Sequence, residues 1–65
     1  MTVINKEGTE INYGVAVQFM DDEVREELHL ELCPCSEQEF FTAYEAAHKD
    51  KFGGEWELSK ENPMY

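Results

Sequence analysis

Carboxylates crowd the middle of the chain. Residues 21–39 hold eight Asp and Glu and one base, Arg25, which gives a net charge of −7. Glu23, Glu27 and Glu31 recur every four residues, and on a helix this spacing forms a row with side chains about 6 Å apart. That interval is comparable to the spacing of phosphates along a nucleic-acid strand. The candidate partner-binding residues are Asp21, Asp22, Glu23, Glu26, Glu27 and Glu31.

An acidic row of this kind has two interpretations. On charge alone, the simpler one is a solvated helix face on a soluble protein. However, like charges four residues apart destabilise a helix by a few tenths of a kcal/mol per pair, so selection for stability alone would alternate Glu with Lys. A small domain also needs a net charge of only about 2–8 for solubility, and this chain carries −10. The density therefore favours mimicry of nucleic acid, in which the row occupies a protein groove that normally binds phosphates.

Two histidines and two cysteines form a second candidate set. Tetrahedral zinc takes such ligands and would stabilise a small domain, but structural sites normally space their cysteines as C-x₂₋₄-C, unlike Cys33-Pro34-Cys35. The four residues are His29, Cys33, Cys35 and His48. A pair of Cys33 or Cys35 with His48 has the residue types for nucleophilic catalysis. A chain of 65 residues leaves little room for a pocket of a few hundred Å³. We therefore expect no enzyme activity, no cofactor and no metal, and keep a zinc-stabilised module as an alternative.

Composition limits the partners. Fifteen Asp and Glu oppose five Lys and Arg, so the chain would repel the phosphates of nucleic acid and of anionic membranes. No signal peptide opens the sequence, and no apolar run approaches the roughly 20 residues of a membrane span. The cysteines resemble cytosolic thiols more than a secreted disulfide framework. We expect a cytoplasmic protein that binds a basic protein surface, with no direct nucleic-acid or membrane contact.

The elements that must position these residues follow from local patterns. A β-hairpin is predicted over residues 2–13, with strand residues up to Tyr13 and with Gly8 supplying the positive φ of its turn. Helices are predicted over residues 14–20, 22–32 and 37–52, with Ser36 and Glu39 as a capping box and Gly53 at the end. Residues 54–65 form a tail, irregular apart from Trp56 packing back on the helices. The fold class is therefore α+β: one small domain with an N-terminal hairpin packed on two or three helices.

The predicted core combines an apolar stripe and a set of aromatic residues. Val24, Leu28 and Leu32 follow one another at four-residue steps on the 22–32 helix. Phe40 and Phe41 are adjacent, so we expect that they do not both reach full depth and that one is a candidate interface anchor. The predicted aromatic core consists of Phe19, Phe40, Phe41, Tyr44, Phe52 and Trp56.

The pattern as a whole resembles a known family. The matching runs are Met20–His29, Cys35–Tyr44 and Lys51–Gly53 together with His48, and the resemblance extends over residues 13–56. The chain is similar to small acidic proteins of phages and conjugative elements that include a type I-C anti-CRISPR protein. This resemblance implies an inhibitor of the CRISPR surveillance complex that presents acidic residues as a DNA mimic.

The resemblance also implies a partner. Such a protein would block target-DNA recognition by occupying the basic DNA-binding surface of a Cas protein, the large subunit of a type I-C complex. The candidate acidic residues lie within residues 13–56, the range of the resemblance, and we expect a monomer that acts in the cytoplasm of the host bacterium. A small acidic structural or adaptor domain, working as an oligomer and without mimicry, is the alternative from a different functional class.

Overall fold

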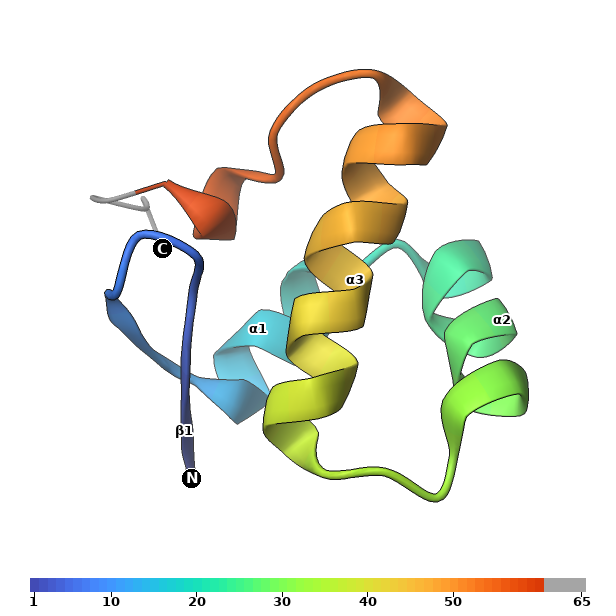
Figure 1. Ribbon diagram of the computed structural model, residues 1–65, viewed down its shortest axis with the longest axis horizontal. Helices are drawn as coiled ribbons and strands as arrows, with labels where there is room; N and C mark the ends of the chain where they lie inside the picture. The colour runs from blue at the N-terminus through green and yellow to red at the C-terminus, as the bar shows by residue number, and fades with distance from the viewer. Residues whose placement is uncertain (61–65) are drawn as a thin grey trace.

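A central helix organises the computed structural model, which describes residues 1–60 (Figure 1). The chain begins with an antiparallel hairpin of β1 (Thr2–Ile4) and β2 (Glu10–Asn12). Three helices follow: α1 (Tyr13–Phe19), α2 (Asp22–Leu32) and α3 (Glu37–Phe52), and a short 3₁₀ helix, η1 (Glu57–Ser59), comes last. The hairpin lies on one side of α3 and α2 on the other. The α+β class, with an N-terminal hairpin and three helices, is therefore confirmed.

The hairpin is held by its turn. Gly8 has a φ of +87°, as predicted for this loop, and Val3 pairs with Ile11 in the register of the strands. Asn5 is buried beside the turn, where its Oδ1 accepts hydrogen bonds from the backbone N–H groups of residues 7 and 9. Its Nδ2 donates to the carbonyl oxygens of Leu58 and Lys60 at 2.8 and 2.9 Å. One amide side chain thus joins the N-terminal hairpin to the far end of the described chain.

Side-chain caps fix where each helix begins. Asn12, Asp21 and Ser36 accept hydrogen bonds from the third backbone N–H that follows each of them, which satisfies donors that have no partner within the helix. Gly53 ends α3 in the left-handed conformation, with a φ of +73°. Because Asn12 is the cap of α1, Tyr13 is helical and does not continue the strand. The first helix therefore begins one residue earlier than predicted and ends before Met20.

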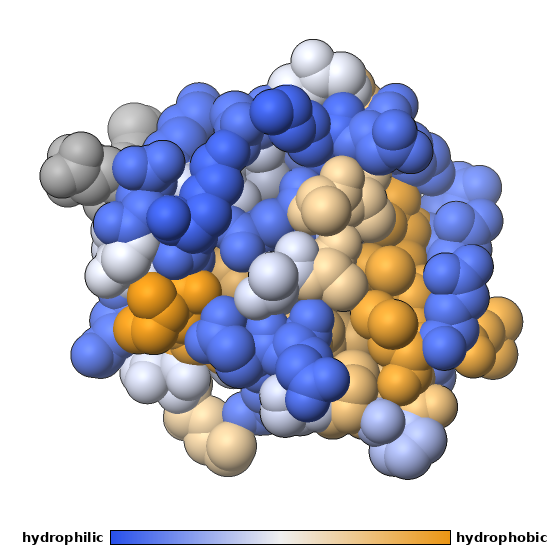
Figure 2. Space-filling model, in the orientation of Figure 1, coloured by the Kyte–Doolittle hydropathy of each residue, from blue (hydrophilic) through white to orange (hydrophobic). Residues whose placement is uncertain are grey.

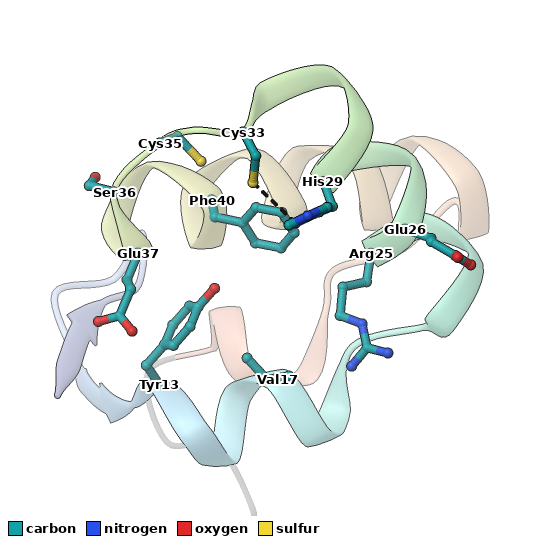
Figure 3. Close-up of a pocket in the computed structure, with 10 residues that line it drawn as sticks. All are labelled: Tyr13, Val17, Arg25, Glu26, His29, Cys33, Cys35, Ser36, Glu37 and Phe40. Atoms are coloured by element: carbon teal, nitrogen blue, oxygen red, sulfur yellow. Dashed lines mark hydrogen bonds between the residues drawn. The ribbon is translucent and has the colours of Figure 1, made fainter.

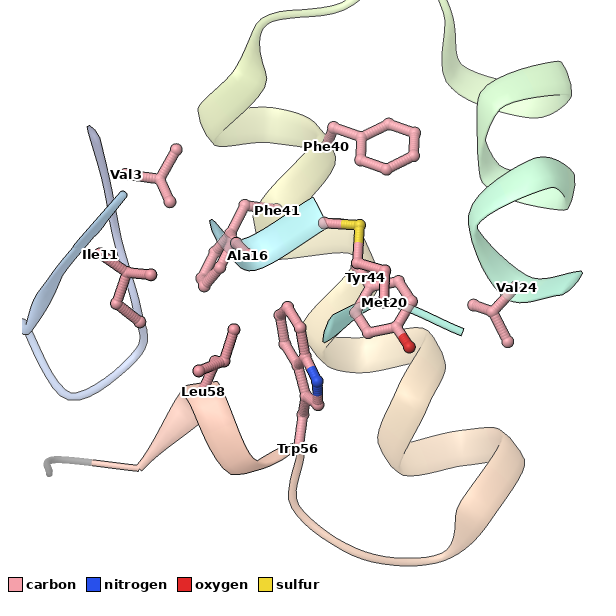
Figure 4. Packing of buried hydrophobic residues seen from close by; sticks show 10 residues of the cluster. All are labelled: Val3, Ile11, Ala16, Met20, Val24, Phe40, Phe41, Tyr44, Trp56 and Leu58. Atoms are coloured by element: carbon pink, nitrogen blue, oxygen red, sulfur yellow. The ribbon is translucent and has the colours of Figure 1, made fainter. Parts of the chain in front are cut away.

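The core surrounds the inner face of α3 (Figure 4). Trp56 packs back on the helices as predicted, with ring centroids 5.3 Å from Phe41 and 4.4 Å from Tyr44. The buried apolar residues are Val3, Ile11, Ala16, Met20, Val24, Phe40, Phe41, Tyr44, Trp56 and Leu58. They come from every helix and both strands, so the hairpin and the helices share one core.

Several expectations about burial were wrong. Phe40 and Phe41 are both buried, because α3 is covered on two sides: Phe40 points toward α2 and Phe41 toward the hairpin and η1. Phe19 and Phe52, expected in the core, are 41% and 51% exposed, and Leu32 is 39% exposed at the end of the predicted stripe. These three residues lie at the C-terminal ends of their helices, where packing partners are fewest.

The segment after α3 also differs from the prediction. Residues 57–59 form η1 instead of an irregular tail, and the rest of that tail, residues 61–65, lies outside the described residues. None of the helices within residues 1–60 has the length and apolar character needed to cross a bilayer.

Candidate functional site

The acidic face consists of Asp22, Glu23, Glu26, Glu27 and Glu31 on the solvent side of α2, with Asp21 at its N-terminus. The five helical residues are all exposed, and the side chains of Asp22 and Glu23 are 90% and 78% accessible. Val24 is buried and Leu28 is half-buried against α3, which turns the opposite side of α2 toward solvent. The structure therefore brings the predicted acidic residues together on one helix.

Two bases partly neutralise the N-terminal end of this face. Arg25 pairs with Asp22 at 3.3 Å. Lys51, from the end of α3, lies 3.4 Å from Glu23 and 3.7 Å from Asp21. Elsewhere on the acidic face, and counting only residues 1–60, Glu26, Glu27 and Glu31 have no ion-pair partner. The unneutralised charge is thus concentrated on the middle and C-terminal turns of α2.

Asp21 has a structural role in addition to its charge. Its carboxylate accepts a hydrogen bond from the N–H of Val24 at 3.2 Å and so caps α2. Its own N–H donates to the Tyr44 hydroxyl at 2.6 Å. These contacts fix the start of α2 against α3, so Asp21 orients the acidic face more than it contributes free charge to it.

An exposed leucine that the sequence patterns did not predict lies within the acidic face. Leu30 is 81% exposed, and Glu26 and Glu27 precede it by one helical turn on the same side. The available signal was its position outside the Val24–Leu28–Leu32 stripe. The face therefore combines carboxylates with one large apolar side chain.

A second candidate is a hollow of about 510 Å³ between α1, α2 and the start of α3 (Figure 3). Cys33 and His29 meet at its edge, with Sγ 3.1 Å from Nδ1. Cys35 also lines the hollow, and burial, followed by a hydrogen bond with Cys33, raises the pKa of its thiol. Burial likewise raises the pKa of Tyr13, whose hydroxyl points into the hollow. Raised pKa values keep these two groups protonated and weaken them as nucleophiles or metal ligands.

The four candidate metal ligands of the alternative zinc module do not come together as one set. His48 contacts the rings of Tyr44, Phe52 and Trp56, its Nδ1 lies 3.2 Å from the Tyr44 hydroxyl, and it lines a different pocket from His29. Burial lowers the pKa of His48. Across the described part of the chain, no three His, Cys, Asp or Glu side chains are grouped to hold a metal ion. The zinc-stabilised module therefore has no supporting geometry, and the acidic face remains the candidate site.

Comparison with models of known protein families assigns this chain to a family. The family described as AcrIC5, anti-CRISPR protein AcrIC5, matches residues 4–56. This range contains the hairpin turn, all three helices and every residue of the acidic face. A search of curated proteins finds no match.

Proposed function

The chain belongs to the AcrIC5 family of anti-CRISPR proteins, and from this premise we propose that it inhibits a type I-C CRISPR complex as a DNA mimic. The family implies a Cas protein or complex as the partner. In this proposal the acidic face of α2 occupies the basic surface with which the large subunit recognises target DNA. The protein then acts as an inhibitor rather than an enzyme, in the cytoplasm of the host bacterium.

The observation that carries the proposal is the linear charge density of α2. Its five carboxylates lie between Asp22 and Glu31, which is about 13 Å of helix axis at about 1.5 Å per residue. That is one carboxylate per about 3 Å, close to the one phosphate per about 3.4 Å along one strand of B-DNA. A groove that binds one DNA strand would therefore meet a similar density of negative charge on α2.

The arrangement is unfavourable for the free protein, which supports a role in binding. Glu23, Glu27 and Glu31 are consecutive neighbours along one face, and each like-charged pair costs about 0.2–0.5 kcal/mol in an isolated helix. Basic groups of a partner would relieve this repulsion on association. Complementary charge of this kind speeds encounter and makes binding weaken with salt.

Charge reversal tests the proposal. Glu26→Lys/Glu27→Lys removes two carboxylates that have no ion-pair partner among residues 1–60, and it changes the net charge from −10 to −6. Glu10→Lys/Glu57→Lys makes the same change of charge at exposed residues of β2 and η1, away from α2. We expect the α2 variant to lose binding to a purified type I-C complex and the control variant to keep it. Equal loss in both variants would show that net charge alone is responsible and that the acidic face has no special role.

A further inference from the structure

A groove lies between the C-terminal end of α2, the loop that follows it and the first half of α3. It has a volume of about 460 Å³ and is lined by Leu32, by Cys35 in the connecting loop, and by Thr42 and Ala43 of α3. In Figure 2 an apolar band lies between α3 and α2, with hydrophilic side chains of α2 along its outer edge. The groove is therefore open on the side where the acidic face ends.

The floor of the groove is apolar and preformed. Leu32 is 39% exposed, and the small side chain of Ala43 leaves room above α3. The polar wall residue Gln38 is already engaged: its side chain accepts from the N–H of Ile4 at 2.7 Å and donates to the Ile4 carbonyl at 2.8 Å. These bonds attach the first turns of α3 to β1 and satisfy the Gln38 amide, so this wall of the groove is held in place by the fold before a ligand binds.

Charge around the groove limits what can occupy it. Glu31 precedes Leu32 on α2, Glu39 lines the groove, and Asp50 lies two turns beyond Ala43 on α3; all three carboxylates are exposed. A second copy of this chain would bring a further net charge of −10 to the same place, which opposes self-association. DNA presents no comparable apolar groove to a protein that binds its phosphates, so mimicry alone does not explain this groove.

We propose that the α2–α3 groove receives an apolar side chain of the Cas partner, carried on a segment that also presents Lys or Arg to the surrounding carboxylates. This inference rests on the proposed function and extends it: the acidic face replaces DNA, and the groove recognises the protein that binds DNA. Apolar burial is insensitive to screening, whereas exposed charge pairs weaken with salt. The groove therefore contributes affinity at every ionic strength and discriminates this Cas protein from other basic proteins.

A matched pair of variants on α3 tests the groove. Ala43→Lys places a charged side chain in it, and Ala46→Lys makes the same substitution on the same helix at an exposed residue that lines a different depression. Affinity for the purified type I-C complex is measured at low and high salt, after circular dichroism has verified the fold of each variant. We expect Ala43→Lys to weaken binding at least tenfold at both salt concentrations, and Ala46→Lys to stay within twofold of the unsubstituted protein.

Further outcomes separate the possible failures. Leu32→Ala shortens an exposed side chain without adding charge, and we expect it to weaken binding about three- to tenfold even if Ala43→Lys does not fold. If both groove variants bind like Ala46→Lys while Glu26→Lys/Glu27→Lys does not bind, the groove inference is wrong and the DNA mimic stands. If Glu26→Lys/Glu27→Lys binds normally, the proposed function fails. A dimer of the free protein that Ala43→Lys dissociates would assign the groove to a second copy and overturn the inference.

Discussion

Replacing Glu27 with lysine is expected to change stability and affinity in opposite directions. Glu27 lies one helical turn from Glu23 and one turn from Glu31, and no ion pair holds it in the described structure. Lysine at this position converts two repulsive pairs into two attractive ones. The intrinsic helix propensities of Glu and Lys are similar, so the change in stability comes from the charges.

The magnitude follows from the two pairs. A like-charged pair four residues apart destabilises the helix by about 0.2–0.5 kcal/mol, and an oppositely charged pair stabilises it by a similar amount. Two pairs change sign in Glu27→Lys, so this substitution should raise the free energy of unfolding by about 1 kcal/mol at low salt. For a domain of this size, that corresponds to a rise in Tm of about 4–8 °C. The gain should shrink in 1 M salt, where the screening length is about 3 Å.

The effect on binding is larger and opposite in sign. Breaking a close charge pair across an interface costs about 2–5 kcal/mol, and about 1.4 kcal/mol is a factor of ten. We therefore expect Glu27→Lys to weaken binding to the type I-C complex at least about 30-fold. Thermal unfolding by circular dichroism and titration calorimetry measure the two effects, with Glu10→Lys as the control for net charge. A lower Tm would show that Glu27 stabilises the fold, and unchanged affinity would place it outside the interface; either result refutes the reasoning.

Three further predictions concern the framework of the site. Asp21→Ala should lower the free energy of unfolding by about 1 kcal/mol in urea denaturation, because α2 loses its cap. Asp21→Asn should retain most of that stability, since asparagine also caps helices. Equal losses in the two variants would show that Asp21 stabilises the fold through its charge and not through capping. Asn5→Asp should destabilise the fold by more than about 2 kcal/mol, because it replaces the Nδ2 group, which donates to the carbonyl oxygens of Leu58 and Lys60, with an acceptor oxygen. A small change in the urea midpoint of unfolding would contradict this prediction. Burial lowers the pKa of His48 in the folded state, so the unfolded chain binds a proton at this residue more readily. The stability that His48 contributes should therefore be full above pH 6.5 and fall as the pH drops through and below that value. His48→Gln should flatten this part of a Tm-versus-pH profile, and an unchanged profile would exclude His48 as the cause.

The helical part of the fold was predictable because its signals are local. Asp21 and Ser36 are capping residues directly before helical patterns, and Gly53 supplies the left-handed residue that ends α3. The burial of Asn5 was not predictable, since its partners Leu58 and Lys60 are more than 50 residues away along the chain. A polar residue beside a turn gives no sign that it will join two ends of a domain.

The same distinction applies to the candidate site. The row of Glu23, Glu27 and Glu31 follows from spacing alone, because residues four apart share a helix face. The partial neutralisation of its first turn depends on Lys51, which reaches Glu23 from another helix. The groove beside Ala43 likewise depends on how α2 and α3 pack, so neither feature can be read from the periodicity of a single segment.

Competition with target DNA tests the central claim most directly. A purified type I-C complex is held with a labelled target duplex, and the bound DNA is measured as this protein is added at two salt concentrations. If the acidic face is a DNA mimic, the protein should displace the duplex completely, at concentrations that rise with salt. If the complex becomes saturated with the protein while its DNA occupancy is unchanged, the two ligands bind at different surfaces and the DNA-mimic account is contradicted.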